Sequence, residues 1–184
     1  MPSILSHSLF TACLTPLRPQ KKDILKTLLL SMICASIPDL DVIGFSFGVQ
    51  YNDMLGHRGW THSISFALLW SLLIVLIFYK QQWKNKFTFY YWIYFYFLCT
   101  ISHGIFDAMT DGGKGVGFFI PFINERYFFY FRPIPVFPLG LHNIFSEWGW
   151  RVFRQELFFF IPLSLSTLFL TSLWRYKFID KITE

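Results

Sequence analysis

The chain has 184 residues, of which 54% are hydrophobic and 15% charged, and its formal net charge is +5. Soluble domains contain roughly 25% charged residues, so the composition excludes a disordered chain and disfavours an ordinary cytosolic domain. Aromatic residues make up 22%, including 24 phenylalanines, which is more than a core of this size can bury. We therefore expect one membrane-embedded domain, residues 1–184, with many aromatic side chains facing lipid.

Five apolar stretches predict an all-α, polytopic helical bundle with about four or five membrane helices. Spanning a bilayer takes about 20 residues, within a range of about 17–25. The last three stretches reach or approach that length, whereas the first two are short and could form a thin hairpin, a re-entrant pair or interfacial helices. In chain order, the stretches are Ser3–Leu17, Ile24–Ile37, Ser63–Tyr79, Phe87–Phe106 and Leu157–Trp174.

The basic residues predict how these helices are oriented. Lysines and arginines lie between the first and second stretches, between the third and fourth, and after the fifth. This spacing fits membrane topology better than nucleic-acid binding, and cytoplasmic loops carry the excess of such residues. The N-terminus is then outside and the C-terminus inside. Segments 38–62 and 107–156 become extracytoplasmic.

This orientation brings histidines and aspartates from distant positions to one membrane face. Ionisable groups inside a membrane are costly and usually functional, so they need partners. His7 alone indicates little, but it needs polar partners in the membrane, and the histidines and aspartates named next are its expected partners. The converging residues are His7, Asp39, Asp41, His57, His62, His103 and Asp107.

The sequence Ile37-Pro-Asp39-Leu-Asp41 interrupts the second stretch. Proline disfavours helix at the preceding residue, so both carboxylates are expected near a turn. Two aspartates this close repel each other unless a cation or a proton lies between them. The alternative is an exposed acidic turn, which is common in soluble proteins.

The sequence GHRGWTHS is the most specific string in the chain. It supplies His57, Arg58 and His62, and the hydroxyl of Thr61 or Ser63 could cap the helix that follows. We expect one histidine on the loop and one on the first turn of that helix. The alternative is a set of polar residues at the membrane interface.

His103 and Asp107 form an HxxxD pair in the fourth stretch. Positions i and i+4 share one face of a helix, so the pair can grip one divalent metal, or it can be a single ion pair. The glycine-rich segment 112–117 lacks the flanking features of a P-loop. We interpret it as a flexible turn near the site.

The long outer segment adds weaker candidates. His142 and Glu147 lie five residues apart and could supply ligands or a catalytic base, or belong to an amphipathic surface helix. Arg58, Arg126 and Arg132 could bind an anionic head group or phosphate by paired hydrogen bonds. For Arg126 and Arg132, snorkelling to lipid head groups is an equal alternative.

Imidazole and carboxylate groups together suit Zn²⁺, and also Mn²⁺ or Fe²⁺, and this set could hold one to three ions. A metal ion lowers the pKa of bound water from 15.7 towards roughly 7, which creates a nucleophile. We expect Asp39, Arg58 and His62 to have catalytic roles, although the aspartate and the histidine could also be ligands. The expected ligands are His7, Asp41, His57, His103 and Asp107.

The order of these motifs resembles the YdjM-like family of bacterial inner-membrane, metal-dependent hydrolases. That family is distantly similar to zinc-dependent phospholipase C and P1-type nucleases, which are all-helical enzymes that cut phosphoesters with a cluster of metal ions. The resemblance implies an inner-membrane hydrolase of this kind. Their pattern has a later HxxxE, from which His142 and Glu147 depart by one position.

Three functions follow from these observations. The first is hydrolysis of a phosphoester, lipid or lipid-linked, because short helices would put the site near head-group depth. The second is transport of a divalent cation, and the third is a non-catalytic membrane protein whose metal is structural. The polar groups cluster at one face, which disfavours transport.

Overall fold

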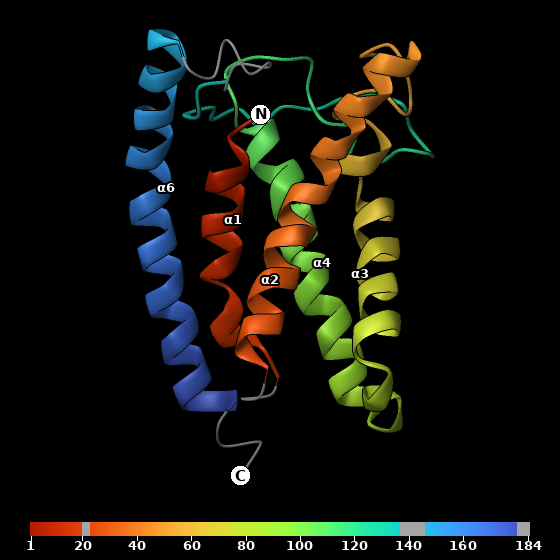
Figure 1. The fold of residues 1–184 in the computed structure, drawn as a ribbon, viewed down its shortest axis with the longest axis vertical. Helices are drawn as coiled ribbons and strands as arrows, with labels where there is room; N and C mark the ends of the chain where they lie inside the picture. The colour runs from red at the N-terminus through yellow and green to blue at the C-terminus, as the bar shows by residue number, and fades with distance from the viewer. Residues whose placement is uncertain (20–22, 137–145, 180–184) are drawn as a thin grey trace.

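The computed structural model describes residues 1–19, 23–136 and 146–179, and within these ranges it contains helices and no strand. The α-helices stand side by side as a bundle (Figure 1). They are α1 (Ile4–Ala12), α2 (Ile24–Ser36), α3 (Ile64–Phe78), α4 (Lys86–Ala108) and α6 (Glu147–Trp174). Shorter elements are the 3₁₀ helices η1 (Thr15–Leu17), η2 (Ile37–Phe47), η3 (Trp60–His62) and η4 (Lys80–Lys84), and the π-helix η5 (Arg175–Ile179). The all-α prediction is confirmed.

Two helical segments of the described chain are long and apolar enough to cross a membrane. They are Ile24–Phe47, which joins α2 to η2, and Glu147–Phe178, which joins α6 to η5. Helix α3 is apolar but has only 15 residues. A membrane helical protein is therefore supported, and the figure of four or five spanning helices stays a prediction.

Helix α6 begins ten residues before the apolar stretch that predicted it. The side chain of Ser146 accepts a hydrogen bond from the Gly149 amide and caps the helix. Glu147 lies in the first turn, where the helix dipole favours a negative charge. The helix therefore includes residues 147–156 of the predicted outer segment.

The expected turn at Asp39 and Asp41 is absent, and this prediction was wrong. The chain continues from α2 into η2, with Pro38 in the first turn of the new helix. Proline is tolerated there because an N–H at that position has no helical partner. Both aspartates consequently project from a rigid element.

The lower half of the bundle has an apolar, aromatic core. Trp92, Phe95 and Tyr96 of α4 are almost completely buried there. The hydroxyls of Tyr79 and Tyr96 lie 2.7 Å apart and form a hydrogen bond inside this core. The polar histidines and aspartates lie nearer the other end of α4, below the loops at the top of Figure 1.

The described residues of the three basic segments lie at the end opposite those loops. Arg175 donates hydrogen bonds to the carbonyls of Pro16 and Arg18. The Lys26 ammonium donates to the carbonyl of Phe78, at the end of α3. Among the described residues, these basic side chains are therefore separated from the histidines, as the orientation argument expects.

Candidate metal centre

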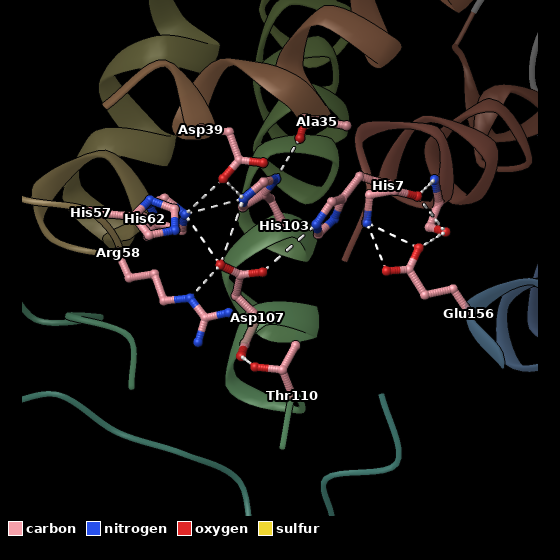
Figure 2. A network of polar contacts seen from close by, with 12 residues as sticks. His7, Ala35, Asp39, His57, Arg58, His62, His103, Asp107, Thr110 and Glu156 are labelled. Carbon is pink, nitrogen blue, oxygen red and sulfur yellow. Dashed lines mark hydrogen bonds and ion pairs between the residues drawn. The ribbon is translucent and has the colours of Figure 1, made fainter. Parts of the chain in front are cut away.

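Four side chains from three elements meet in the upper part of the bundle. His103 and Asp107 project from α4 one turn apart, as the HxxxD spacing predicts. Asp39 comes from η2 and His62 from η3. Figure 2 shows the four converging, and each is at most 5% exposed.

The donor atoms of these residues are separated as the ligands of one tetrahedral ion would be. Bond lengths of about 2.0–2.2 Å place tetrahedral ligands about 3.3–3.6 Å apart. The Nε2 atoms of His62 and His103 are 3.1 Å apart, and they lie 3.6 and 3.2 Å from Asp39 Oδ1. Asp107 Oδ2 lies 3.4 Å from His62 Nε2 and 4.0 Å from His103 Nε2.

The carboxylate oxygens of this set are buried without hydrogen bonds. Neither oxygen of Asp39, nor either oxygen of Asp107, has a hydrogen-bond partner. Buried polar groups are nearly always satisfied, and among these four oxygens only Asp107 Oδ2 has a guanidinium beside it, so the set calls for a further cation. This observation and the donor separations fit a divalent metal ion.

The ring of His103 is oriented by the backbone of α2. Its Nδ1 lies 2.6 Å from the carbonyl oxygen of Ala35, which only accepts, so Nδ1 carries the proton. The lone pair of Nε2 is then directed at the other donors. Metal-binding histidines are commonly held in this way by the nitrogen that does not bind the metal.

A second donor set shares His62 with the first. Asp41 Oδ1 lies 2.7 Å from His57 Nδ1, and Asp41 Oδ2 lies 3.2 Å from His62 Nδ1. Thr61 and the Arg58 amide also donate to Asp41 Oδ2. One imidazole therefore faces the first set with Nε2 and the second set with Nδ1, and two neighbouring ions would both bind it only if His62 lost its N–H proton and bridged them.

His7 lies at the edge of the first set. Its ring stacks on His103 with centroids 3.9 Å apart and an interplanar angle of 16°. Its Nε2 is 3.8 Å from Asp107 Oδ1, and neither ring nitrogen forms a hydrogen bond. His7 therefore contacts His103 and Asp107, as the sequence predicts.

Arg58 places a guanidinium beside the donors. Its Nε lies 2.9 Å from Asp107 Oδ2, although without hydrogen-bond alignment, and its Nη1 donates to the Gly112 carbonyl. The backbone of Arg58 has φ of 64°, which is uncommon outside glycine and clusters at functional sites. Gly113, with φ of 88°, leaves room for the guanidinium, since a Cβ there would lie 2.5 Å from Nη1.

The cluster has an excess of negative charge. Three buried carboxylates, Asp39, Asp41 and Asp107, against one guanidinium give a formal charge of −2 when the imidazoles are neutral. Burial disfavours the charged form of His62, but its interactions with the three carboxylates outweigh this and hold the pKa of His62 well above its usual range. The surroundings therefore favour a positive charge, which a divalent ion would supply.

Other candidates from the sequence lie away from the donors. Arg126 donates to the carbonyls of Tyr51, Asp53 and His57, so it holds the loop that carries the second set. Arg132 lies over the ring of Phe128, 5.0 Å from its centroid. The structure therefore brings neither arginine to the cluster.

Of the last pair of candidates, the structure describes only Glu147, which is not brought to the cluster. Glu147 occupies the first turn of α6 and is exposed. His142 lies outside the described residues. The glycine-rich segment is near the site as expected, since Gly112 is bonded to Arg58.

Glu156 is a buried group that the motif analysis missed. It is fully buried on α6, and its carboxylate accepts hydrogen bonds from the Ser3 amide and the Ser6 hydroxyl (Figure 2). These bonds fix the start of α1, one turn from His7. The available signal in the sequence was a glutamate directly before the fifth apolar stretch.

Comparison with known proteins identifies the family. The chain belongs to the family described as YdjM inner membrane protein, whose sequence pattern matches residues 1–178. It is 35% identical over 157 residues to the inner membrane protein YbcI of Escherichia coli strain K12, which covers 85% of this chain and 89% of that protein. No solved structure matches it. An inner-membrane location follows from the family.

Proposed function

We propose that this member of the YdjM inner membrane protein family is a membrane-bound, metal-dependent hydrolase that cleaves a phosphoester, lipid or lipid-linked. We also propose that the chain is distantly similar to zinc-dependent phospholipase C and P1-type nucleases, because the order of its motifs resembles theirs. Zn²⁺ is the ion we expect, with Mn²⁺ or Fe²⁺ as alternatives. The site would face outward and the chain would cross the membrane several times.

The observation that carries this proposal is the position of Arg58. A buried guanidinium beside a metal ion costs electrostatic repulsion, which the ion pair with Asp107 offsets only in part because that carboxylate would be shared with the ion. An anionic phosphoryl oxygen between the two cations would remove that cost. Guanidinium groups suit this role because they bind phosphate by paired hydrogen bonds.

The residues have separate roles in the proposed reaction. A divalent ion bound here would lower the pKa of a water molecule to roughly 7, and so would supply a nucleophile at neutral pH. His62, His103, Asp39 and Asp107 hold that ion in place. Arg58 neutralises the charge that grows on the phosphoryl oxygens in the transition state.

The second donor set supports proton transfer or a second ion. His57 is buried, with its Nδ1 held by Asp41 at 2.7 Å, so its ring orientation is fixed. A carboxylate that orients an imidazole in this manner supports either general-base catalysis or metal binding. The departing or attacking oxygen would have to lie within hydrogen-bond reach of this ring.

The test is hydrolysis by the purified protein in detergent. We expect metal-dependent release of nitrophenol from bis(p-nitrophenyl) phosphate and of phosphate groups from phospholipid micelles. Arg58→Gln should keep its metal and lose at least about a hundredfold in rate, as for the loss of one transition-state donor. Lys80→Gln, at the other end of the bundle, is the matched control.

Two outcomes would contradict the proposal. One is unchanged hydrolysis after metal removal, and the other is equal rates for Arg58→Gln and Lys80→Gln. The outward orientation has its own readout, because a chelator that cannot cross the membrane should abolish hydrolysis in intact spheroplasts. Activity that survives this treatment would place the site inside.

A structural metal site is the second candidate function, because four protein donors already complete a tetrahedral set. Structural zinc sites use four protein ligands, whereas catalytic sites leave one position open. This alternative predicts one tightly held ion per chain and no hydrolysis by any variant. Cation transport is less favoured, because the aromatic core of α2, α3 and α4 lies between the cluster and the opposite end.

A further inference from the structure

A large pocket opens on α6, on the opposite side of an aromatic layer from His7. It has a volume of about 980 Å³, at the upper end of the roughly 300–1,000 Å³ of small-molecule sites. Its walls are one face of α6, the prolines of the 133–135 segment, and Asp111. The ring of Phe160 meets His7 edge-on at 6.4 Å, and its neighbour Phe159 lines the pocket.

The pocket is basic at one end and apolar along its length. Arg151 and Arg154 lie on it within the first two turns of α6, and neither forms an ion pair with any described residue. Phe158, which is 86% exposed, and Leu163 continue the same helix face towards the middle of the segment. Residues spaced by three and four share one face, so the arginines lie in line with the apolar floor.

The position of the arginines matches the depth of a lipid phosphate. Trp148 and Trp150, about half exposed, precede them on α6, and tryptophan is enriched where a membrane helix meets the head groups. The apolar face then runs from Arg154 to Ser166, which is about 18 Å of helix. One leaflet of hydrocarbon is about 15 Å deep, so the length suits an acyl chain.

We propose that this pocket binds a phospholipid of the surrounding membrane. Its phosphate is held by Arg151 and Arg154, and an acyl chain lies along Phe158, Phe159 and Leu163. The carboxylate of Asp111, whose Oδ1 accepts from the Val136 amide, also lines the pocket, and it favours a head group that carries an amine. Binding needs no metal, so this site is independent of the proposed hydrolysis.

The test is native mass spectrometry of delipidated protein titrated with phosphatidylethanolamine, phosphatidylglycerol, diacylglycerol and inorganic phosphate. We expect the tightest one-to-one adduct with phosphatidylethanolamine, and at least tenfold weaker binding of diacylglycerol and of phosphate alone. The double variant Arg151→Gln, Arg154→Gln should bind phosphatidylethanolamine at least tenfold more weakly. The matched control Lys177→Gln, at the far end of the same helical segment, should bind normally.

Three results would overturn the proposal. They are equal lipid binding by the double variant and the control, binding of diacylglycerol as tight as that of the phospholipid, or a lipid-free dimer that buries this face. The His103→Ala variant separates this proposal from the catalytic one. It should lose metal and hydrolysis while it still binds lipid through the pocket.

Discussion

At the scale of single residues, His62 is the centre of the account, because both of its ring nitrogens face carboxylates. Its Nε2 lies 3.6 Å from Asp39 and 3.4 Å from Asp107, and its Nδ1 lies 3.2 Å from Asp41. The GHRGWTHS string identified this residue, and sequence alone left it as either a metal ligand or the general base. The structure places it among the donors, because η2 and η3 turn both sets of carboxylates towards one ring.

Metal binding should depend on pH through His62. Burial lowers the pKa of His62, but its interactions with three carboxylates hold that pKa well above 6.5, so a metal ion must compete with a proton for the ring. Ligand nitrogens must be deprotonated to bind a metal. We therefore expect the apparent affinity for Zn²⁺ to rise with pH and to keep rising above pH 6.5, with proton release on binding.

The affinity for Zn²⁺ and the number of protons released are both measured by isothermal titration of metal-free protein with Zn²⁺ in buffers of different ionisation enthalpy. An affinity that is constant between pH 6 and 8, with no proton release, would contradict this picture of His62. Lys80→Gln, far from the cluster, should show the same pH dependence as the unchanged protein.

At the scale of elements, the close approach of α4 to η3 sets the geometry. Gly104 lies next to His103, and a Cβ on it would lie 2.8 Å from the backbone oxygen of His62. That contact is too short for any real Cβ, and backbone cannot move aside cheaply. The glycine therefore allows the two imidazoles to approach within 3.1 Å.

Gly104→Ala should push η3 away from α4 and weaken metal binding. Changes to residues that support metal ligands typically cost 10–100-fold in affinity, and we expect a loss in that range. Ile105→Ala, on the exposed side of the same turn, is the matched control and should bind Zn²⁺ normally. Equal affinities for the two variants, measured by competition with a chromogenic chelator, would count against the close-packed geometry.

Sequence reasoning succeeded where a local rule decides the outcome. The HxxxD spacing predicted the shared face of α4, and Ser63 caps α3 as expected, accepting from the Phe66 amide at 3.1 Å. It failed at Pro38, because a proline in a first turn can begin a 3₁₀ helix as well as end an α-helix. Pairings between distant segments, such as Glu156 with Ser3, depend on tertiary packing that no local pattern contains.

At the scale of the whole molecule, polar and apolar functions are segregated along the bundle. One half holds an aromatic core that includes Trp92 and Tyr96, and the other holds the donors. The apolar half packs together the helices that carry the donor side chains, so the geometry of the donors does not depend on loops alone. Sequence composition predicted the membrane setting, whereas the grouping of the donors into two sets could be found only from the three-dimensional arrangement.

The most direct test of the account is the metal content of the protein purified from membranes in detergent, measured by elemental mass spectrometry. We predict at least one divalent ion, most abundantly zinc, per chain, and loss of that ion in His103→Ala and Asp107→Ala variants that keep normal helicity and a single gel-filtration peak. Protein that holds less than about a tenth of an ion per chain after incubation with Zn²⁺, Mn²⁺ or Fe²⁺, or variants that hold as much as the unchanged chain, would contradict the central claim.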